Sequence, residues 1–327
     1  MRTEKVKIAI WGFGAMGSGM ARMLLKKQGF EIIGVCDRNP NYVGKSIFDI
    51  LQIEQKDQKD CIVNPNIDEV VKPGACDLVL LATDSFTEKA FPKIKWLLEQ
   101  KVNVISTAEE MAYPKAKHPE LAAEMNRIAK ENGVTVIGTG INPGMMMDLL
   151  VVCLSGVMEE QGVGLTIEDF NKGLEDGSLA GHVGFIESTY MIADALKWKV
   201  EDFKQQMKPI VTEVDRKSPY GFAGAGNVAG VNMTAQGIVD GEVKINLVHP
   251  QQIEPELGGV HTGDYIKIVG NPGVNMAITP EVDGGIGTIA MCVNMIPHVI
   301  NALPGLKTMI DLPVPRAIMG DVREMIE

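Results

Sequence analysis

The chain has 327 residues, of which 45% are hydrophobic and 22% are charged, and its formal net charge is -11. This length suffices for two domains, each with a core of its own. The negative charge argues against nucleic acid and against an anionic membrane surface as partners, because both carry dense negative charge themselves. We therefore expect a small-molecule substrate.

The sequence shows no targeting or spanning segment. Residues 1–5 lead directly into a strand-like run, and no later run reaches about 18 uninterrupted apolar residues. The five cysteines are scattered and never spaced C-x-x-C, so neither a disulfide framework nor a zinc site is indicated. We expect a cytoplasmic protein that does not contact a membrane and holds no metal.

The first part of the chain alternates short apolar runs with amphipathic segments of helix length. This pattern is typical of parallel strands joined by crossover helices. The expected strands are 6–11, 31–36, 78–82, 102–106 and 134–138. The expected helices are 18–27, 87–99 and 118–131. The sequence thus predicts a Rossmann-type α/β domain over residues 1–148.

The pattern changes after Gly144. Two more helices are expected, at 145–157 and 185–197. The stretches 232–249 and 264–279 then alternate as antiparallel hairpins do, with turns at Asp240-Gly241 and at 271–273. We predict a second, α+β domain with an antiparallel or mixed sheet over 149–286, for substrate binding and dimerisation.

A last helix is expected at 287–303, followed by the tail "LPVPRAI". The segment 287–327 is predicted to pack back on the first domain. A homodimer is expected, because an antiparallel sheet of this kind has edges and faces to cover.

The strongest local motif is G-x-G-x-x-G, formed by Gly12, Gly14 and Gly17 between the first strand and the first helix. Such a turn brings the main chain and a helix N-terminus close to a pyrophosphate. Asp37 follows 20 residues after Gly17, where a carboxylate can bind the adenosine ribose. The predicted cofactor-binding residues are Gly12, Phe13, Gly14, Ala15, Met16, Gly17, Asp37, Arg38, Ala82, Thr83 and Thr107.

The choice between NAD and NADP stays open at this point. Asp37 favours NAD, because a carboxylate repels a 2'-phosphate. Arg38 is the next residue and could pair with that phosphate if Asp37 rotated away. Both cofactors are therefore considered.

Three loops are candidates for the chemistry, because ligands of open α/β sheets bind beyond the carboxyl ends of the strands. They are 83–87, 107–114 and 138–148. Glu109 and Glu110 are adjacent carboxylates in the second loop. A carboxylate shielded from water near a nicotinamide suits a general base or an ammonium-binding group. Alternatively, both are ordinary glutamates at a helix start.

Two further polar residues are candidates for substrate binding. Asn142 lies in a rigid Asn-Pro-Gly turn of the third loop, and His182 precedes a helix in a glycine-rich stretch. Each could equally be structural. Thr139, at the start of the third loop, is a third candidate.

Several longer strings resemble one enzyme family. They are "WGFGAMGSGMARMLL", "STAEEMAYP", "GTGINPGMMMDLL", "QGVGLTIEDFNKGLEDGSLAGHVGF" and "VNMIPHVINALPGLKTMIDLPVPRA". They are similar to the 2,4-diaminopentanoate dehydrogenase family, amine dehydrogenases of ornithine breakdown whose fold is related to dihydrodipicolinate reductase. The last three strings are specific, since other Rossmann dehydrogenases do not carry them.

The resemblance implies NAD(P)-dependent oxidative deamination of 2,4-diaminopentanoate to 2-amino-4-oxopentanoate and ammonia. It assigns a catalytic glutamate to the "AEEM" loop, with Glu109 preferred over Glu110. Hydride would leave C4 of the substrate, and water deprotonated by Glu109 would add to the resulting iminium ion. Thr139, Asn142 and His182 would contact the substrate.

The chain departs from the family pattern in one place. Between Val157 and Gln161 it lacks a strand and loop of about 20 residues, on a domain of typical size. Either a segment is missing from the chain as written or it has been deleted. We favour the former, because losing that strand would leave backbone groups of its neighbour unpaired.

Two other functions are considered. A dihydrodipicolinate-type imine reductase shares fold and cofactor, but nothing here matches its basic catalytic cluster, and Glu109 would face an already dianionic substrate. A non-catalytic dinucleotide sensor would explain the glycine turn and Asp37, but it leaves Glu109 and Asn142 without a role.

Overall fold

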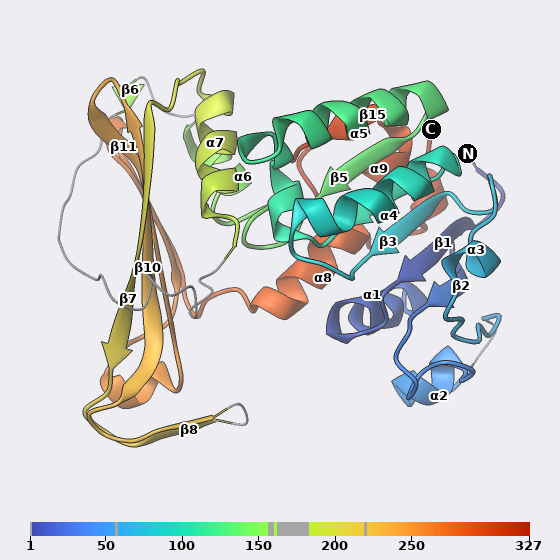
Figure 1. Cartoon of the computed structure of the whole chain (residues 1–327), viewed down its shortest axis with the longest axis horizontal. Helices are drawn as coiled ribbons and strands as arrows, with labels where there is room; N and C mark the ends of the chain where they lie inside the picture. The colour runs from blue at the N-terminus through green and yellow to red at the C-terminus, as the bar shows by residue number, and fades with distance from the viewer. Residues whose placement is uncertain (1, 56–57, 156–159, 162–182, 219–220) are drawn as a thin grey trace. The chain divides into compact units, whose positions relative to one another are not determined.

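The computed structural model describes residues 2–55, 58–155, 160–161, 183–218 and 221–327 (Figure 1). The chain divides into two compact units, one formed by Met1–Met145 with Asp283–Glu327 and the other by Met146–Val282. The boundaries predicted from the sequence, after residues 148 and 286, lie a few residues from these. The expected C-terminal segment falls in the first unit.

The first unit contains a six-stranded sheet of order β15-β5-β4-β3-β1-β2, and every neighbouring pair is parallel. The strands are β1 (Val6–Trp11), β2 (Phe30–Cys36), β3 (Leu78–Leu81), β4 (Asn103–Ser106), β5 (Thr135–Gly138) and β15 (Gly305–Lys307). The predicted Rossmann-type sheet is confirmed. The short β15 was not predicted, because its three residues form no apolar run.

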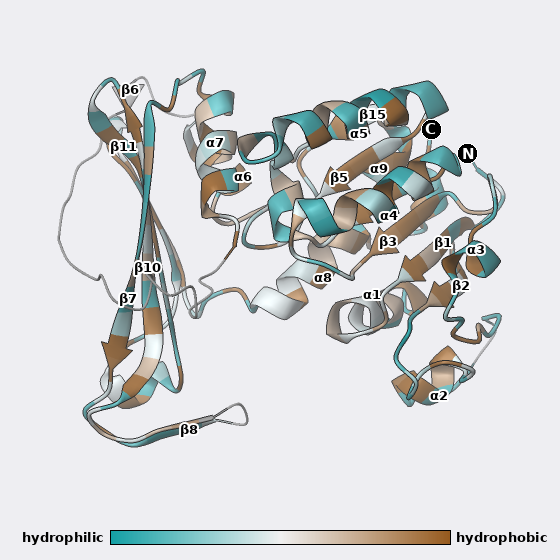
Figure 2. Ribbon diagram, in the orientation of Figure 1, coloured by the Kyte–Doolittle hydropathy of each residue, from teal (hydrophilic) through white to brown (hydrophobic). Residues whose placement is uncertain are grey.

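Helices cover both faces of this sheet. They are α1 (Ala15–Leu25), α2 (Ile47–Leu51), α3 (Ile67–Val70), α4 (Thr87–Glu99), α5 (Pro119–Asn132), α8 (Gly284–Asn294) and α9 (Ile296–Asn301). Helices α4 and α5 contact each other over one face, and α1 contacts α8 (Figure 1). The longer central strands are mostly apolar (Figure 2), as burial on both faces requires.

The sequence predicted one helix over residues 287–303, and this prediction was wrong. The structure has two helices that meet at Met295. Pro297 has no backbone N–H to donate to the preceding turn, so a continuous helix is interrupted there. Helix α8 packs closely on α1, since a Cβ on Gly19 would lie 2.2 Å from Cδ1 of Ile289.

The second unit contains an antiparallel sheet of order β11-β10-β7. Its strands are β7 (Asp202–Val211), β10 (Val228–Val239) and β11 (Glu242–Gln252). Asp240 and Gly241 both have positive φ, +52° and +75°, which matches the tight hairpin turn that joins β10 to β11. Strands β12 (Asp264–Ile268) and β14 (Val274–Ile278) form another antiparallel pair. Both predicted hairpins are confirmed.

Two helices belong to this unit, α6 (Leu149–Ser155) and α7 (Phe185–Ala195). Phe185 packs with Met207, Met233 and Ala235 of the sheet to form the core. Helix α6 begins four residues later than predicted, because residues 145–148 form turns. Its predicted end at 157, and the junction before Gln161, fall on residues 156–159, outside the described part of the chain.

The remaining elements are short. They are β6 (Glu160–Gln161), β8 (Arg216–Ser218), β9 (Gly221–Ala223), β13 (Gly270–Asn271) and 3-10 turns at Glu109–Ala112, Pro114–Ala116, Pro255–Gly258 and Val322–Met325. Among the helices of the described residues, none has the length and apolar character needed to cross a bilayer.

Candidate functional site

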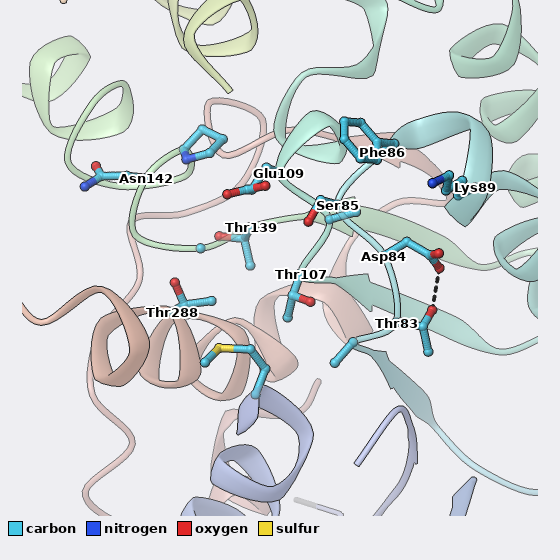
Figure 3. Close-up of a pocket in the computed structure, with 15 residues that line it drawn as sticks. Thr83, Asp84, Ser85, Phe86, Lys89, Thr107, Glu109, Thr139, Asn142 and Thr288 are labelled. Carbon is cyan, nitrogen blue, oxygen red and sulfur yellow. Dashed lines mark hydrogen bonds between the residues drawn. The ribbon is translucent and has the colours of Figure 1, made fainter. Parts of the chain in front are cut away.

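A cavity of about 510 Å³ opens at the carboxyl edge of the parallel sheet, within the first unit (Figure 3). Its walls come from the ends of β3, β4 and β5, with Met16 of α1 and Thr288 of α8. The lining residues of the three loops are 82–86, 107–109, 139, 140, 142 and 143, and Lys89 of α4 completes the wall. All three loops predicted to carry the chemistry thus meet at one cavity.

The glycine turn has the geometry that a dinucleotide requires. Gly12 has a φ of +95°, and a Cβ there would lie 2.4 Å from the carbonyl oxygen of Ala82. A Cβ on Gly17 would lie 1.8 Å from the carbonyl oxygen of Gly12, so these two glycines close the turn on itself. Gly14 differs, because no atom lies within 4 Å of its would-be Cβ. The space beside Gly14, at the N-terminus of α1, can accept a pyrophosphate.

Alanine substitutions should therefore separate folding from cofactor binding. Gly17→Ala is expected to lower the free energy of unfolding by about 1–3 kcal/mol, because its Cβ overlaps the main chain of Gly12. Gly14→Ala should melt like the parent protein and bind NAD+ at least about tenfold more weakly, because its methyl group projects into the pyrophosphate space. Calorimetric melting and NAD+ titration measure the two effects. Equal affinity of Gly14→Ala and the parent protein would exclude this binding mode.

Asp37 ends β2 beside the glycine turn. Its Oδ2 accepts the N–H of Phe13 at 2.5 Å and its Oδ1 accepts the N–H of Asn39 at 2.7 Å. A carboxylate has about four lone-pair positions, so two remain for ribose hydroxyls. Arg38 is exposed, and no hydrogen bond or ion pair joins it to another described residue. The carboxylate is held on two sides, whereas the guanidinium is not.

The loop after β3 forms the next part of the cavity wall. Ala82 and Thr83 line it, as does Thr107 from the loop after β4. The Thr83 hydroxyl donates to Asp84 at 2.5 Å (Figure 3), and Lys93 of α4 forms an ion pair with the same carboxylate. The loop is thereby tied to α4.

The two adjacent glutamates point in different directions. Glu109 is half-buried and lines the cavity together with Thr139 (Figure 3). Glu110 is only 3% exposed and is not among the lining residues. It accepts the N–H of Thr87 at 2.8 Å and the ammonium of Lys117 at 2.9 Å. Of the two carboxylates, Glu109 is therefore the one placed to meet a substrate.

Glu110 stabilises the loop that carries Glu109. Burial alone raises the pKa of Glu110, but the Lys117 ammonium, the Thr87 N–H and the nearby His118 outweigh it, so the pKa lies below its ordinary value of 4.5. A carboxyl group whose pKa is lowered by folding stabilises the protein above its unfolded pKa and loses this contribution as pH falls through its folded pKa.

Glu110→Gln is accordingly expected to destabilise the protein at pH 7, by about 1–3 kcal/mol, because charged hydrogen bonds at a buried site are lost. The difference from the parent protein should shrink as pH is lowered below 4.5. Denaturant unfolding at several pH values measures it. A difference that is independent of pH would contradict an ionised Glu110.

The predicted substrate-binding residues have different outcomes. Thr139 is 3% exposed and lines the cavity, and its hydroxyl donates to the sulfur of Met309 at 3.1 Å. Asn142 also lines the cavity. His182 lies outside the described residues.

Several lining residues were not named as candidates from the sequence, among them Ser85, Lys89 and Thr288. Thr288 is the most informative, because it comes from the C-terminal segment and accepts the N–H of Ile141 at 3.1 Å. One indication of this position was available from the sequence, because the segment 287–327 was expected to pack on the first domain. In the described part of the chain, no group of three or more His, Cys, Asp or Glu side chains could hold a metal.

Two protein families match parts of this chain. Residues 145–327 match the family described as 2,4-diaminopentanoate dehydrogenase C-terminal domain, and residues 8–112 match ketopantoate reductase PanE/ApbA. The 2,4-diaminopentanoate dehydrogenase of Acetoanaerobium sticklandii is 60% identical over 346 aligned positions, which cover 99% of this chain and 98% of the relative. The alignment is longer than this chain, so the relative contains residues that the chain lacks.

Two more distant relatives share the architecture. An amine dehydrogenase of Streptomyces virginiae is 23% identical over 96% of this chain and 98% of its own length. The structure of an amine dehydrogenase from Mycobacterium smegmatis matches with a TM-score of 0.82 at 23% identity, covering 96% of this chain and 98% of that one. The match to the Mycobacterium smegmatis structure shows that the two chains share their fold over almost their whole length.

Proposed function

The chain belongs to the 2,4-diaminopentanoate dehydrogenase family, and we propose that it catalyses the NAD(P)-dependent oxidative deamination of 2,4-diaminopentanoate to 2-amino-4-oxopentanoate and ammonia, a step of ornithine degradation. The observation that carries this proposal is the position of Glu109. Its carboxylate lines a cavity beside the glycine turn, together with the hydroxyl-bearing residues Thr107, Thr139 and Thr288.

The residues of the first unit fit the cofactor. Gly14 leaves open space for the pyrophosphate at the N-terminus of α1, and Asp37 offers carboxylate lone pairs for the adenosine ribose. Ala82, Thr83 and Thr107 line the cavity between this turn and Glu109. When bound, the nicotinamide supplies the hydride acceptor for the oxidation at C4.

The residues of the cavity fit a cationic amine. The Glu109 carboxylate attracts the C4 ammonium group, takes a proton from the attacking water, and returns a proton to the departing nitrogen. Thr139 offers a hydroxyl oxygen whose own proton is directed at Met309, so that oxygen accepts N–H or O–H groups of the ligand. Asn142 also lines this cavity, and its amide is our candidate for the polar groups at the other end of the substrate.

A spectrophotometric assay tests the proposal. The protein is incubated with NAD+ or NADP+ and 2,4-diaminopentanoate, and the reduced nicotinamide is followed by its absorbance. Reduction that depends on the diamine is the expected result. A protein that binds both cofactors but reduces neither would instead be a dinucleotide sensor. Turnover of dihydrodipicolinate with NAD(P)H, without turnover of the diamine, would indicate the imine reductase.

The proposal includes a homodimer in the cytoplasm. Among the described residues, β7 and β11 are the two edges of the antiparallel sheet, and each exposes a large apolar side chain, Val211 at 56% and Val248 at 55%. Pairing or covering such edges with a second copy removes them from water. Sedimentation equilibrium would show a mass of twice 35.4 kDa if this is correct.

A further inference from the structure

Two threonine hydroxyls in the cavity have opposite hydrogen-bonding polarity. The Thr139 O–H donates to Sδ of Met309 at 3.1 Å, which leaves its oxygen as an acceptor. The Thr288 oxygen accepts the N–H of Ile141 at 3.1 Å, which leaves its O–H as a donor. Both residues line the cavity that contains Glu109 (Figure 3). A ligand in this cavity therefore meets an acceptor at Thr139 and a donor at Thr288.

The Thr288 oxygen is held in place at the cavity wall before a ligand binds. Its side chain is half-buried on α8, and no acceptor for its O–H lies within hydrogen-bonding distance among the described residues. Gly140 packs against it, since a Cβ on Gly140 would lie 3.3 Å from Oγ1 of Thr288. The bond from Ile141 and this close contact hold the hydroxyl at the cavity wall. Because the oxygen is already in place, only rotation of its O–H bond is needed when charge develops near it.

Other hydroxyls of the cavity are less suitable donors. The Thr83 O–H is used by Asp84, and the Thr107 O–H is directed at the carbonyl oxygen of Leu81, at 3.5 Å. Ser85 is exposed to solvent. Thr288 is thus the half-buried hydroxyl of this wall whose proton is left for a ligand.

The proposed reaction requires both polarities at C4. The substrate ammonium first gives one proton to solvent, hydride then leaves C4 of the neutral amine, and the nitrogen becomes an iminium group that has only N–H donors. Water next forms a C4–O bond and gives one proton to Glu109. Glu109 returns that proton to the nitrogen, the C4–N bond breaks and ammonia leaves, and the remaining O–H proton passes to Glu109 as the oxygen becomes a carbonyl. The nitrogen needs acceptors, whereas the carbonyl oxygen needs a donor.

We propose that the Thr288 hydroxyl donates to the oxygen that forms at C4, while Glu109 and the Thr139 oxygen face the nitrogen. The two hydroxyl groups thereby distinguish the incoming water from the departing ammonia. This inference rests on the proposed deamination, and it assigns a substrate contact to the C-terminal helix α8.

The test compares Thr288→Val with Thr288→Ser, which keeps the hydroxyl. The ligand is 2-amino-4-oxopentanoate, titrated calorimetrically into the protein with saturating NAD+, a pair between which no hydride can pass. Thr288→Val is expected to weaken ketone binding about tenfold and to leave the KM of the diamine and the Kd of NAD+ within about twofold of the parent protein. Thr288→Ser should match the parent protein in all three measurements.

The controls separate the possible failures. Valine also removes the acceptor for the Ile141 N–H, so a displaced loop would weaken diamine and ketone alike, and that result would overturn the proposal. Weaker NAD+ binding would place Thr288 at the cofactor and overturn it too. A parent protein that reduces no cofactor with the diamine would refute the function itself. An active parent protein with an unchanged Thr288→Val variant would refute the role of Thr288 alone.

Discussion

Glu109→Gln is expected to lower kcat for the deamination by about 10²–10⁴-fold while leaving the Kd of NAD+ within a few-fold of the parent value. Glutamine has nearly the same shape as glutamate, but it neither attracts the C4 ammonium group nor takes a proton from water. The glycine turn and Asp37 are separate from this side chain, so cofactor binding should be unaffected. The kcat and KM of the diamine, and a fluorescence titration with NAD+, measure these effects.

The matched control is Glu120→Gln, which removes an exposed carboxylate of α5. We expect Glu120→Gln to keep full activity. This result would show that the loss of activity in Glu109→Gln does not come from removing one negative charge from the chain. Glu110→Gln is not a suitable control, because Glu110 stabilises the loop that carries Glu109. Substantial turnover by Glu109→Gln would mean that another group activates the water, and the assignment of the base would be wrong.

The roles of the two adjacent glutamates show what a sequence can and cannot predict. Adjacency at a strand end places both residues at the carboxyl edge of the sheet, because that edge follows from the strand pattern. Which of them faces the cavity depends on the 3-10 turn at Glu109–Ala112 and on side chains distant in sequence. The Thr87 N–H and the Lys117 ammonium donate to the Glu110 carboxylate and hold it away from the cavity. Neither residue forms a recognisable sequence motif with Glu110, so these bonds could not be predicted.

The C-terminal segment, residues 287–327, was also only partly predictable from the sequence. Its apolar pattern predicts helix, and its packing on the first unit was expected. The interruption beside Pro297 could have been predicted from proline chemistry alone. The position of Thr288 in the cavity could not, because it depends on the close packing of Ile289 on Gly19 of α1. Long-range packing between small and branched side chains leaves no periodic signal in the sequence.

The geometry of Asp37 also bears on the cofactor, which the sequence left open between NAD and NADP. Rotation of the carboxylate away from the ribose would release two main-chain N–H groups, those of Phe13 and Asn39. Unmade hydrogen bonds of this kind cost about 1–3 kcal/mol each where the groups are shielded from water. The carboxylate is therefore expected to stay in place and to repel a 2'-phosphate.

The protein should accordingly prefer NAD+ over NADP+ by about 10²-fold in kcat/KM, equivalent to about 2.7 kcal/mol. Asp37→Asn removes the charge but keeps an oxygen for one of the two N–H groups, so it should raise kcat/KM for NADP+ and lower that for NAD+. Because Arg38 is exposed and has no ion-pair partner among the described residues, it can then approach the phosphate. Steady-state kinetics with both cofactors measure the change.

Adding Arg38→Ala to Asp37→Asn tests which residue provides the new affinity. The double variant should lose most of the gain with NADP+ and keep the activity of Asp37→Asn with NAD+, because only the 2'-phosphate offers the guanidinium a charge to pair with. Arg38→Ala alone should change neither cofactor's kcat/KM by more than about twofold, since the held carboxylate keeps the phosphate out. Equal use of both cofactors by the parent protein would show that Asp37 moves despite its two main-chain bonds.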